Sequence, residues 1–112
     1  MCRNNQENGR ITAMDKRQAI ELVRQYKGVI AESFGDAKIY LYGSYSKGNA
    51  HKDSDIDVAV IVKSPVQDWL QMSAYLWKMT RKVSTLIEPV LIEECHPSPL
   101  YEDILKTGTF IQ

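Results

Sequence analysis

Hydrophobic positions divide the first half of the chain into a polar tail, a helix and a strand. Residues 1–11 are polar and predict a flexible N-terminal tail. From Thr12, with Asp15 at capping-box spacing, apolar residues recur at helical spacing as far as Phe34. Residues 38–42 (KIYLY) are short and rich in β-formers, and they predict a strand.

Two strands and two helices are predicted in the second half. Residues 55–62 (DIDVAVIV) are nearly all apolar after the first three, which is typical of a strand covered on both faces. Residues 86–92 (LIEPVLI) also predict a strand, and Pro89, which cannot donate a ladder hydrogen bond, indicates an edge or a bulge. Ser–Pro pairs favour helix starts, and the predicted helices are residues 65–83 after Ser64 and residues 99–106 after Ser98.

The order α-β-β-α-β-α predicts one domain over residues 12–112. Its class is α/β (α+β), with a small mixed sheet packed against helices. A length of 112 residues fits a single domain and leaves no room for a separate substrate domain. The 14 basic and 14 acidic residues cancel, which makes nucleic acid an unlikely direct partner.

The chain shows no signature of a membrane protein or of a disulfide framework. It contains no apolar run of about 18 residues, so we expect no membrane span. Cys2 and Cys95 are isolated thiols. Unpaired cysteines are typical of a reducing compartment, so we expect a cytoplasmic protein without disulfides.

The predicted helix over residues 65–83 is apolar around an arc of about 220°. Two interpretations follow from this width. The helix is wedged into the core, or Leu70 and Trp77 form a patch for a partner protein or a second copy of the chain.

Asp55 and Asp57 are the most informative pair of residues in the sequence. Side chains of a strand alternate between its two faces, so these two carboxylates point to the same side. Like charges side by side are costly unless a cation lies between them. Carboxylate oxygens are ligands that suit Mg²⁺.

Three other interpretations compete for this region. An EF-hand fails because Val58 and Ser64 stand where the motif needs Gly and Glu. A P-loop fails because Asn49 and Ala50 follow Gly48 in place of Lys and Ser or Thr. The third interpretation, solvated acids at a strand entry, stays open for an isolated D-x-D pair.

The loop in front of the pair favours phosphate chemistry. Gly43 and Ser44 follow directly on the first strand, where glycine allows a close ligand approach and serine offers a hydroxyl and an N–H. A phosphate-holding turn beside a metal-holding pair is what nucleotidyl transfer needs. The loop also carries Lys47, His51 and Lys52. Loop residues are usually solvated, which is the favoured interpretation, and the alternative is that they neutralise phosphate charge.

Residues 43–60 (GSYSKGNAHKDSDIDVAV) resemble the signature of the DNA polymerase beta-like nucleotidyltransferase superfamily. The short chain is similar to the minimal nucleotidyltransferase branch, called MNT. The resemblance runs from Lys38 to Phe110 and includes the closing segment PLYEDILKTGTF. It implies a polymerase beta-like fold.

The resemblance also implies a set of site residues. Gly43 and Ser44 would hold the triphosphate of ATP or another NTP, and Asp55 and Asp57 would ligate Mg²⁺, with two ions expected. Glu88 would supply a third carboxylate as metal ligand or base, at a position that is commonly Asp in this branch. A solvated acid on an edge strand is the alternative for Glu88.

The resemblance finally implies a partner. Proteins similar to this one are antitoxins that add AMP to a tyrosine of a small helical HEPN-type RNase toxin. The alternative is a non-catalytic module that neutralises its partner by contact. Aminoglycoside nucleotidyltransferases share the signature but need an additional helical domain for the drug. A homo-oligomer is compatible with the sequence.

Overall fold

A four-stranded mixed sheet forms the centre of the computed structural model, which describes residues 15–50 and 54–112. The strands, in the spatial order β3-β2-β1-β4, are β1 (Lys38–Tyr42), β2 (Ile56–Val62), β3 (Ile87–Glu93) and β4 (Thr109–Ile111). The helices are α1 (Lys16–Phe34), α2 (Ser44–Lys47), α3 (Trp69–Met79) and α4 (Pro99–Thr107), with a 3₁₀ turn at Thr80–Lys82. The mixed α+β class predicted from the sequence is confirmed.

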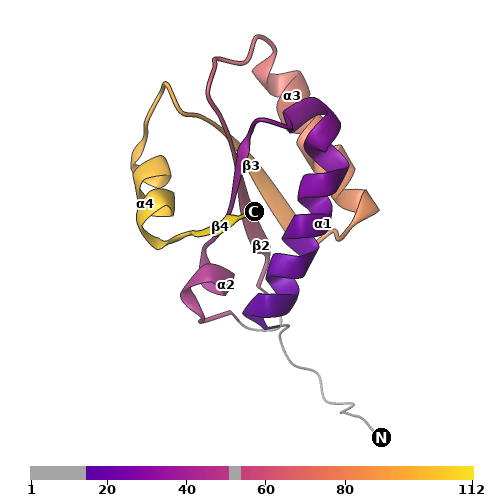
Figure 1. Ribbon diagram of the computed structural model, residues 1–112, viewed down its shortest axis with the longest axis vertical. Helices are drawn as coiled ribbons and strands as arrows, with labels where there is room; N and C mark the ends of the chain where they lie inside the picture. The colour runs from indigo at the N-terminus through magenta and orange to yellow at the C-terminus, as the bar shows by residue number, and fades with distance from the viewer. Residues whose placement is uncertain (1–14, 51–53) are drawn as a thin grey trace, which may run out of the picture.

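Strand pairing decides which residues meet across the sheet. β1 runs antiparallel to β2 and β4, whereas β2 and β3 are parallel. β3 is an edge strand, as Pro89 indicated, so the ladder loses no hydrogen bond on its open side. Helices α1 and α3 cover one face of the sheet and α4 lies on the other (Figure 1).

The core lies on both faces of β2, which confirms the expectation of a doubly covered strand. Ile56, Val58 and Val60 pack in the cluster that α1 fills. Ala59 and Ile61 alternate with them and pack with Ile104 of α4. The sheet is therefore clamped between the helices, and the period of two along β2 assigns each residue to one face.

Two predicted helix starts are wrong. The helix predicted after Ser64 begins at Trp69, because the Asp68 carboxylate caps it by accepting the Gln71 N–H at 3.1 Å. The backbone N–H of Val66 is instead held by Glu93 Oε2 at 2.6 Å. The first helix is capped by Asp15 in a capping box with Gln18, and Thr12 lies outside the described residues.

The structure contains two short elements, α2 and β4, that the sequence did not predict. The loop after β1 contains one helical turn, α2, and the chain ends in β4, which pairs with β1. The predicted cap of α4 is confirmed, since Ser98 Oγ accepts the Tyr101 N–H at 3.2 Å. Within the described part of the chain, no helix is long and apolar enough to cross a membrane. The predicted tail, residues 1–11, lies outside the described residues.

Candidate active site

One row of polar side chains crosses the sheet at the end where α2 lies. Asp57 of β2 pairs with Tyr42 of β1 on one side and with Glu88 of β3 on the other. Directly paired residues point to the same face of a sheet. This is the α4 face, because Tyr42 packs with Ala59 and Ile104. The strand register thus brings together two carboxylates far apart in sequence.

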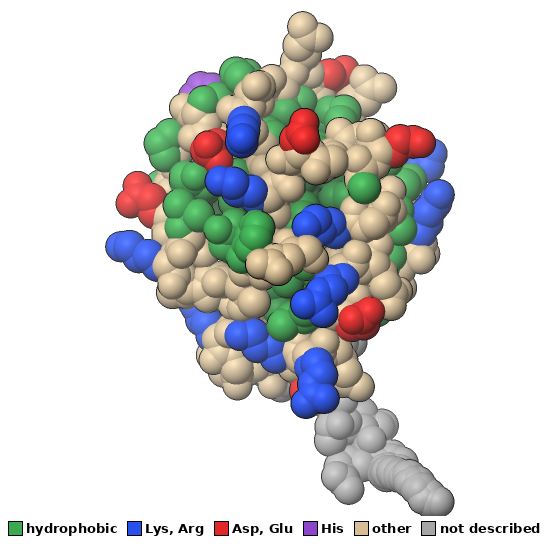
Figure 2. Space-filling view, in the orientation of Figure 1, with side chains coloured by type: hydrophobic (Ala, Val, Ile, Leu, Met, Phe, Trp, Pro, Cys, Tyr) green, Lys and Arg blue, Asp and Glu red, His purple; other side chains and the backbone are tan. Residues whose placement is uncertain are grey.

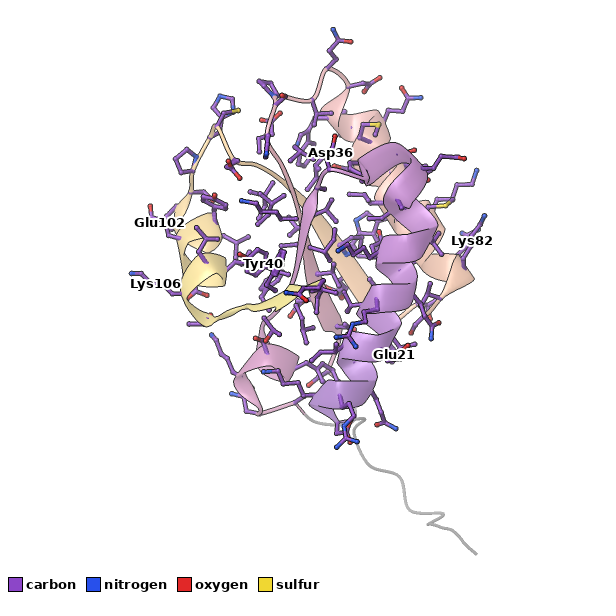
Figure 3. The ribbon with its side chains drawn as sticks, in the orientation of Figure 1. Glu21, Asp36, Tyr40, Lys82, Glu102 and Lys106 are labelled. Atoms are coloured by element: carbon purple, nitrogen blue, oxygen red, sulfur yellow. The ribbon has the colours of Figure 1, made fainter. Side chains whose placement is uncertain are left out.

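Helix α4 leaves this row open. Ile104 packs on Ala59 and Ile61, further along β2 than Asp57. Tyr40, two residues before Tyr42 on β1, faces α4, and Figure 3 shows its side chain on that side of the sheet. Asp57 and Glu88 are half-buried rather than enclosed. A ligand can therefore reach them from the α4 face.

Gly43 closes the turn directly beside Asp57. Its backbone has φ 76° and ψ −151°, a region that is essentially restricted to glycine. A Cβ at this position would collide with Asp57 Oδ2 and lie 3.1 Å from Asp57 Cγ. Glycine is thus required both by the backbone conformation and by the carboxylate. The close approach that the sequence predicted for Gly43 is present, and the group it approaches is Asp57.

The acids of the site disfavour one another's ionised forms. Burial, and secondly the charge of Asp55, raise the pKa of Asp57. A hydrogen bond with the Asp55 side chain, then burial and the charges of Asp55 and Asp57, raise the pKa of Glu88. Burial and the charges of Asp57 and Glu88 raise the pKa of Tyr42 to about 12. The site therefore has an excess of negative charge that a bound cation would relieve.

The three carboxylates suit Mg²⁺ in donor chemistry. Asp55 lies just before β2 and is exposed, and it is close enough to Glu88 to raise the pKa of that carboxyl. Mg²⁺ is usually bound by one or two carboxylates together with substrate phosphates and waters. In residues 15–50 and 54–112, however, no three His, Cys, Asp or Glu side chains already form a set that could hold a metal ion. Asp55, Asp57 and Glu88 are neighbours that a cation would still have to draw together.

Ser46 links helix α2 to the segment that joins α4 to β4. The buried Ser46 Oγ lies 2.9 Å from Thr107 O and 2.9 Å from Thr109 Oγ1. Lys16 Nζ donates to the Ser46 carbonyl at 3.2 Å. Ser44, at the first position of α2, directly follows Gly43. Lys47 ends the same turn and is exposed.

Sequence reasoning missed Tyr42 and Ser46. Alternation along β1 places Tyr42 on the face of Tyr40, but only the register with Asp57 shows that it belongs to the site. Ser46 gave no signal, since its partners Thr107 and Thr109 are about 60 residues away (61 and 63). The predicted basic residues His51 and Lys52 lie outside the described residues.

A model of the nucleotidyltransferase domain matches residues 23–106. The chain belongs to the nucleotidyltransferase domain family. This nucleotidyltransferase is 34% identical over 50 residues to Protein adenylyltransferase MntA of Shewanella oneidensis, a match to 45% of this chain and 32% of MntA. The chain therefore spans about a third of the length of MntA. It is 22% identical over 95 residues to MJ0141 of Methanocaldococcus jannaschii, assigned as a protein adenylyltransferase, over 81% of this chain and 96% of MJ0141.

Solved structures share the fold of this nucleotidyltransferase. A Sulfolobus solfataricus protein assigned as a nucleotidyltransferase superposes with a TM-score of 0.62 at 19% identity, covering 85% of this chain and 80% of that one. A chain from a toxin–antitoxin structure with AMP-PNP superposes with a TM-score of 0.50 at 22% identity, covering 88% of this chain and 73% of that one. The nucleotidyltransferase fold is therefore common to all three chains.

Proposed function

We propose that this nucleotidyltransferase transfers AMP from ATP to a hydroxyl of a partner protein. The observation that carries the proposal is the row of Asp57 and Glu88 across β2 and β3, with the Gly43 backbone against Asp57. Clustered acids on an open sheet face beside a glycine turn can position a metal-bound triphosphate. The relative MntA is named a protein adenylyltransferase, which supports AMP as the group transferred.

Each residue of the site takes a distinct part in the proposed reaction. Asp55 and Asp57 would hold the cation, and Glu88 would be the third ligand or the base. Gly43 and Ser44 bind the phosphate oxygens, and Lys47 adds positive charge near the outgoing pyrophosphate. Mg²⁺, when bound, would neutralise charge on the triphosphate and on the attacking and leaving oxygens.

The chemistry is an in-line displacement at the α-phosphorus. The acceptor oxygen forms a bond to the α-phosphorus. The bond between the α-phosphorus and the oxygen that bridges it to the β-phosphorus breaks, so pyrophosphate leaves. The acceptor hydroxyl loses its proton to a carboxylate, for which Glu88 at the sheet edge is best placed. The products are the acceptor-bound AMP ester and pyrophosphate.

The proposed acceptor is a tyrosine of a small helical toxin of the HEPN type. The open α4 face of the sheet gives a large partner access to the acids. The toxin–antitoxin structure that shares the fold contains AMP-PNP, an ATP analogue, which supports both the nucleotide and the kind of partner.

Label transfer in an extract of the native cells tests the proposal. The purified chain is incubated with the extract, Mg²⁺ and α-labelled ATP, and labelled proteins are identified by mass spectrometry. We expect a small helical protein carrying AMP on a tyrosine. Asp57→Asn should abolish the labelling, whereas Asp103→Asn, a matched change of an exposed acid on α4, should leave it intact.

The contact-only alternative gives a different result. A partner that is captured equally by the wild type and by Asp57→Asn, and that carries no AMP in either case, would contradict catalysis and support neutralisation by binding.

A further inference from the structure

The outward side of α3 carries large apolar side chains in contact with solvent. Leu70 is 78% exposed and Trp77 is 49% exposed. Of the 11 residues in α3, Leu76 is the buried one. At 100° per residue, Leu70, Ala74 and Trp77 form a stripe directed away from the core. Leu70 and Trp77 therefore lie outside the core, as the patch interpretation requires, while the opposite side of α3 packs in it through Leu76. That the patch binds a partner stays a prediction.

A hollow of about 520 Å³ opens on the same side of the molecule as this stripe. It is lined by Ala74, Trp77, Lys78, Thr80, Arg81 and Thr85. Leu70, the most exposed large apolar side chain, lies seven residues before Trp77, a rise of about 10 Å along the helix. One helix thus presents both a projecting side chain and a recess large enough to receive a leucine.

We propose that α3 is the interface of a homodimer. Two copies of the helix pack antiparallel about a twofold axis near Ala74, and the Leu70 side chain of each copy enters the hollow of the other. A twofold interface requires that one patch be complementary to itself. Positions 70 and 77 are nearly symmetric about position 74, so each Leu70 meets a Trp77. The small Ala74 side chain at the crossing point allows the helices to approach closely.

The charges near α3 favour the antiparallel arrangement. Lys78, Arg81 and Lys82 gather at the C-terminal end, and Figure 3 shows Lys82 at the outer edge of the molecule. The N-terminal end carries the exposed N-cap carboxylate Asp68 between the uncharged Gln67 and Gln71. Antiparallel packing places the cations of one copy opposite the end of the other that carries the Asp68 carboxylate and the two carboxamides. Parallel packing would bring the two sets of cations together, which is unfavourable.

The dimer leaves the candidate active site accessible. Helices α3 and α1 cover the sheet face opposite α4, whereas Asp57 and Glu88 lie on the α4 face (Figure 1). The α4 face has its own exposed apolar side chains, and Figure 2 shows hydrophobic groups gathered over β4 beside α4. That face remains free for the acceptor when α3 is covered.

The interface is small, so the dimer should be weak. Eleven residues of α3 rise about 16 Å, and a pair of such helices covers less than the roughly 800 Å² per partner of a standard stable interface. We therefore expect association only at micromolar or higher protein concentrations.

Sedimentation equilibrium from about 5 to 500 µM protein tests the dimer. The wild type should move from the mass of one chain towards that of two. Leu70→Glu should weaken association at least about tenfold. The matched control Leu105→Glu, on α4 with Leu105 47% exposed, should not. Both leucines are exposed, so circular dichroism should show folded variants. A wild type that stays monomeric throughout, or a control as damaging as Leu70→Glu, overturns the proposal.

Cross-linking at the axis tests the geometry. In a background with Cys2 and Cys95 replaced by Ser, Ala74→Cys should form a disulfide-linked dimer on oxidation. Facing Cα atoms of closely packed helices lie within the range of about 4.4–6.8 Å that a disulfide spans. Leu105→Cys in the same background should stay monomeric. Absence of the Ala74→Cys dimer at a concentration where the wild type associates, or equal cross-linking of both variants, contradicts the twofold axis at α3.

Discussion

Replacing Gly43 by Ala tests the link between the turn and the acid site. At φ 76° and ψ −151° a residue with a Cβ is strained by about 1–3 kcal/mol. The new Cβ also collides with the Asp57 carboxylate, with Cγ only 3.1 Å away, so that side chain must move. Together these two effects should lower the free energy of unfolding by about 3 kcal/mol.

Two other glycines serve as matched controls. Gly48 also has a positive φ of 80°, but a Cβ there meets nothing within 4 Å, so Gly48→Ala should cost about 1 kcal/mol. Gly28, inside α1, also has open space, and Gly28→Ala should stabilise by about 0.5–1 kcal/mol. Urea unfolding measures all three values, provided that the slope stays constant.

A double-mutant cycle separates backbone strain from the collision. Asp57→Ala removes the carboxylate and keeps the Cβ, which lies at an ordinary 3.4 Å from the position that a Cβ on residue 43 would take. In this background Gly43→Ala should cost about 1 kcal/mol less than in the wild type. A Gly43→Ala variant no less stable than Gly48→Ala, or a cycle without coupling, would refute the proximity of the turn and Asp57.

Two further changes test the electrostatics of the fold. Because the pKa of Asp57 is raised in the folded state, its ionised form opposes folding at neutral pH. Asp57→Asn in EDTA should therefore raise the free energy of unfolding by about 0.5–1 kcal/mol, after allowance for solvent screening, and the melting temperature by a few degrees. This gain in stability should shrink as the pH falls, because Asp57 of the wild type then becomes protonated. Added Mg²⁺ should stabilise the wild type and not the variant. Glu93 has a lowered pKa, chiefly because the Val66 N–H donates to it and secondarily because His96 lies nearby. The stability that ionised Glu93 adds is present above the ordinary carboxylate pKa and is lost as the pH falls. The melting temperatures of the wild type and Glu93→Gln should therefore converge in acid. A difference in melting temperature that is independent of pH would contradict this role of the Glu93 charge.

The sequence predicts the elements that local patterns determine. Strand β1 and the Ser98 cap of α4 agree with the structure, and the apolar run of β2 correctly predicted burial on both faces. Pro89 correctly placed β3 at an edge, because a missing N–H is tolerated there. These features depend on residues close together in the chain.

Elements that depend on distant contacts were not predictable. Strand β4 has three residues and exists because β1 offers it an antiparallel partner. The start of α3 is shifted because Glu93, nearly 30 residues away (27), takes the Val66 N–H that the predicted first turn would have used. Equal Ser–Pro signals at residues 64 and 98 therefore gave opposite outcomes.

The candidate site also combines features that depend on nearby residues with features that depend on distant contacts. The D-x-D pair and the glycine turn are legible in the sequence, and Glu88 was assigned through a family resemblance. Its place beside Asp57, and the presence of Tyr42 on the other side, follow from strand register. Register is set by packing of the whole sheet and is not encoded in any single segment.

The intact mass of the partner protein tests the central claim most directly. The partner is purified with the wild type or with Asp57→Asn after incubation with Mg²⁺ and ATP. We predict that the partner gains the mass of AMP with the wild type and with Asp103→Asn, and is unmodified with Asp57→Asn. A partner that gains AMP equally with Asp57→Asn would contradict the assignment of this acid row as the active site.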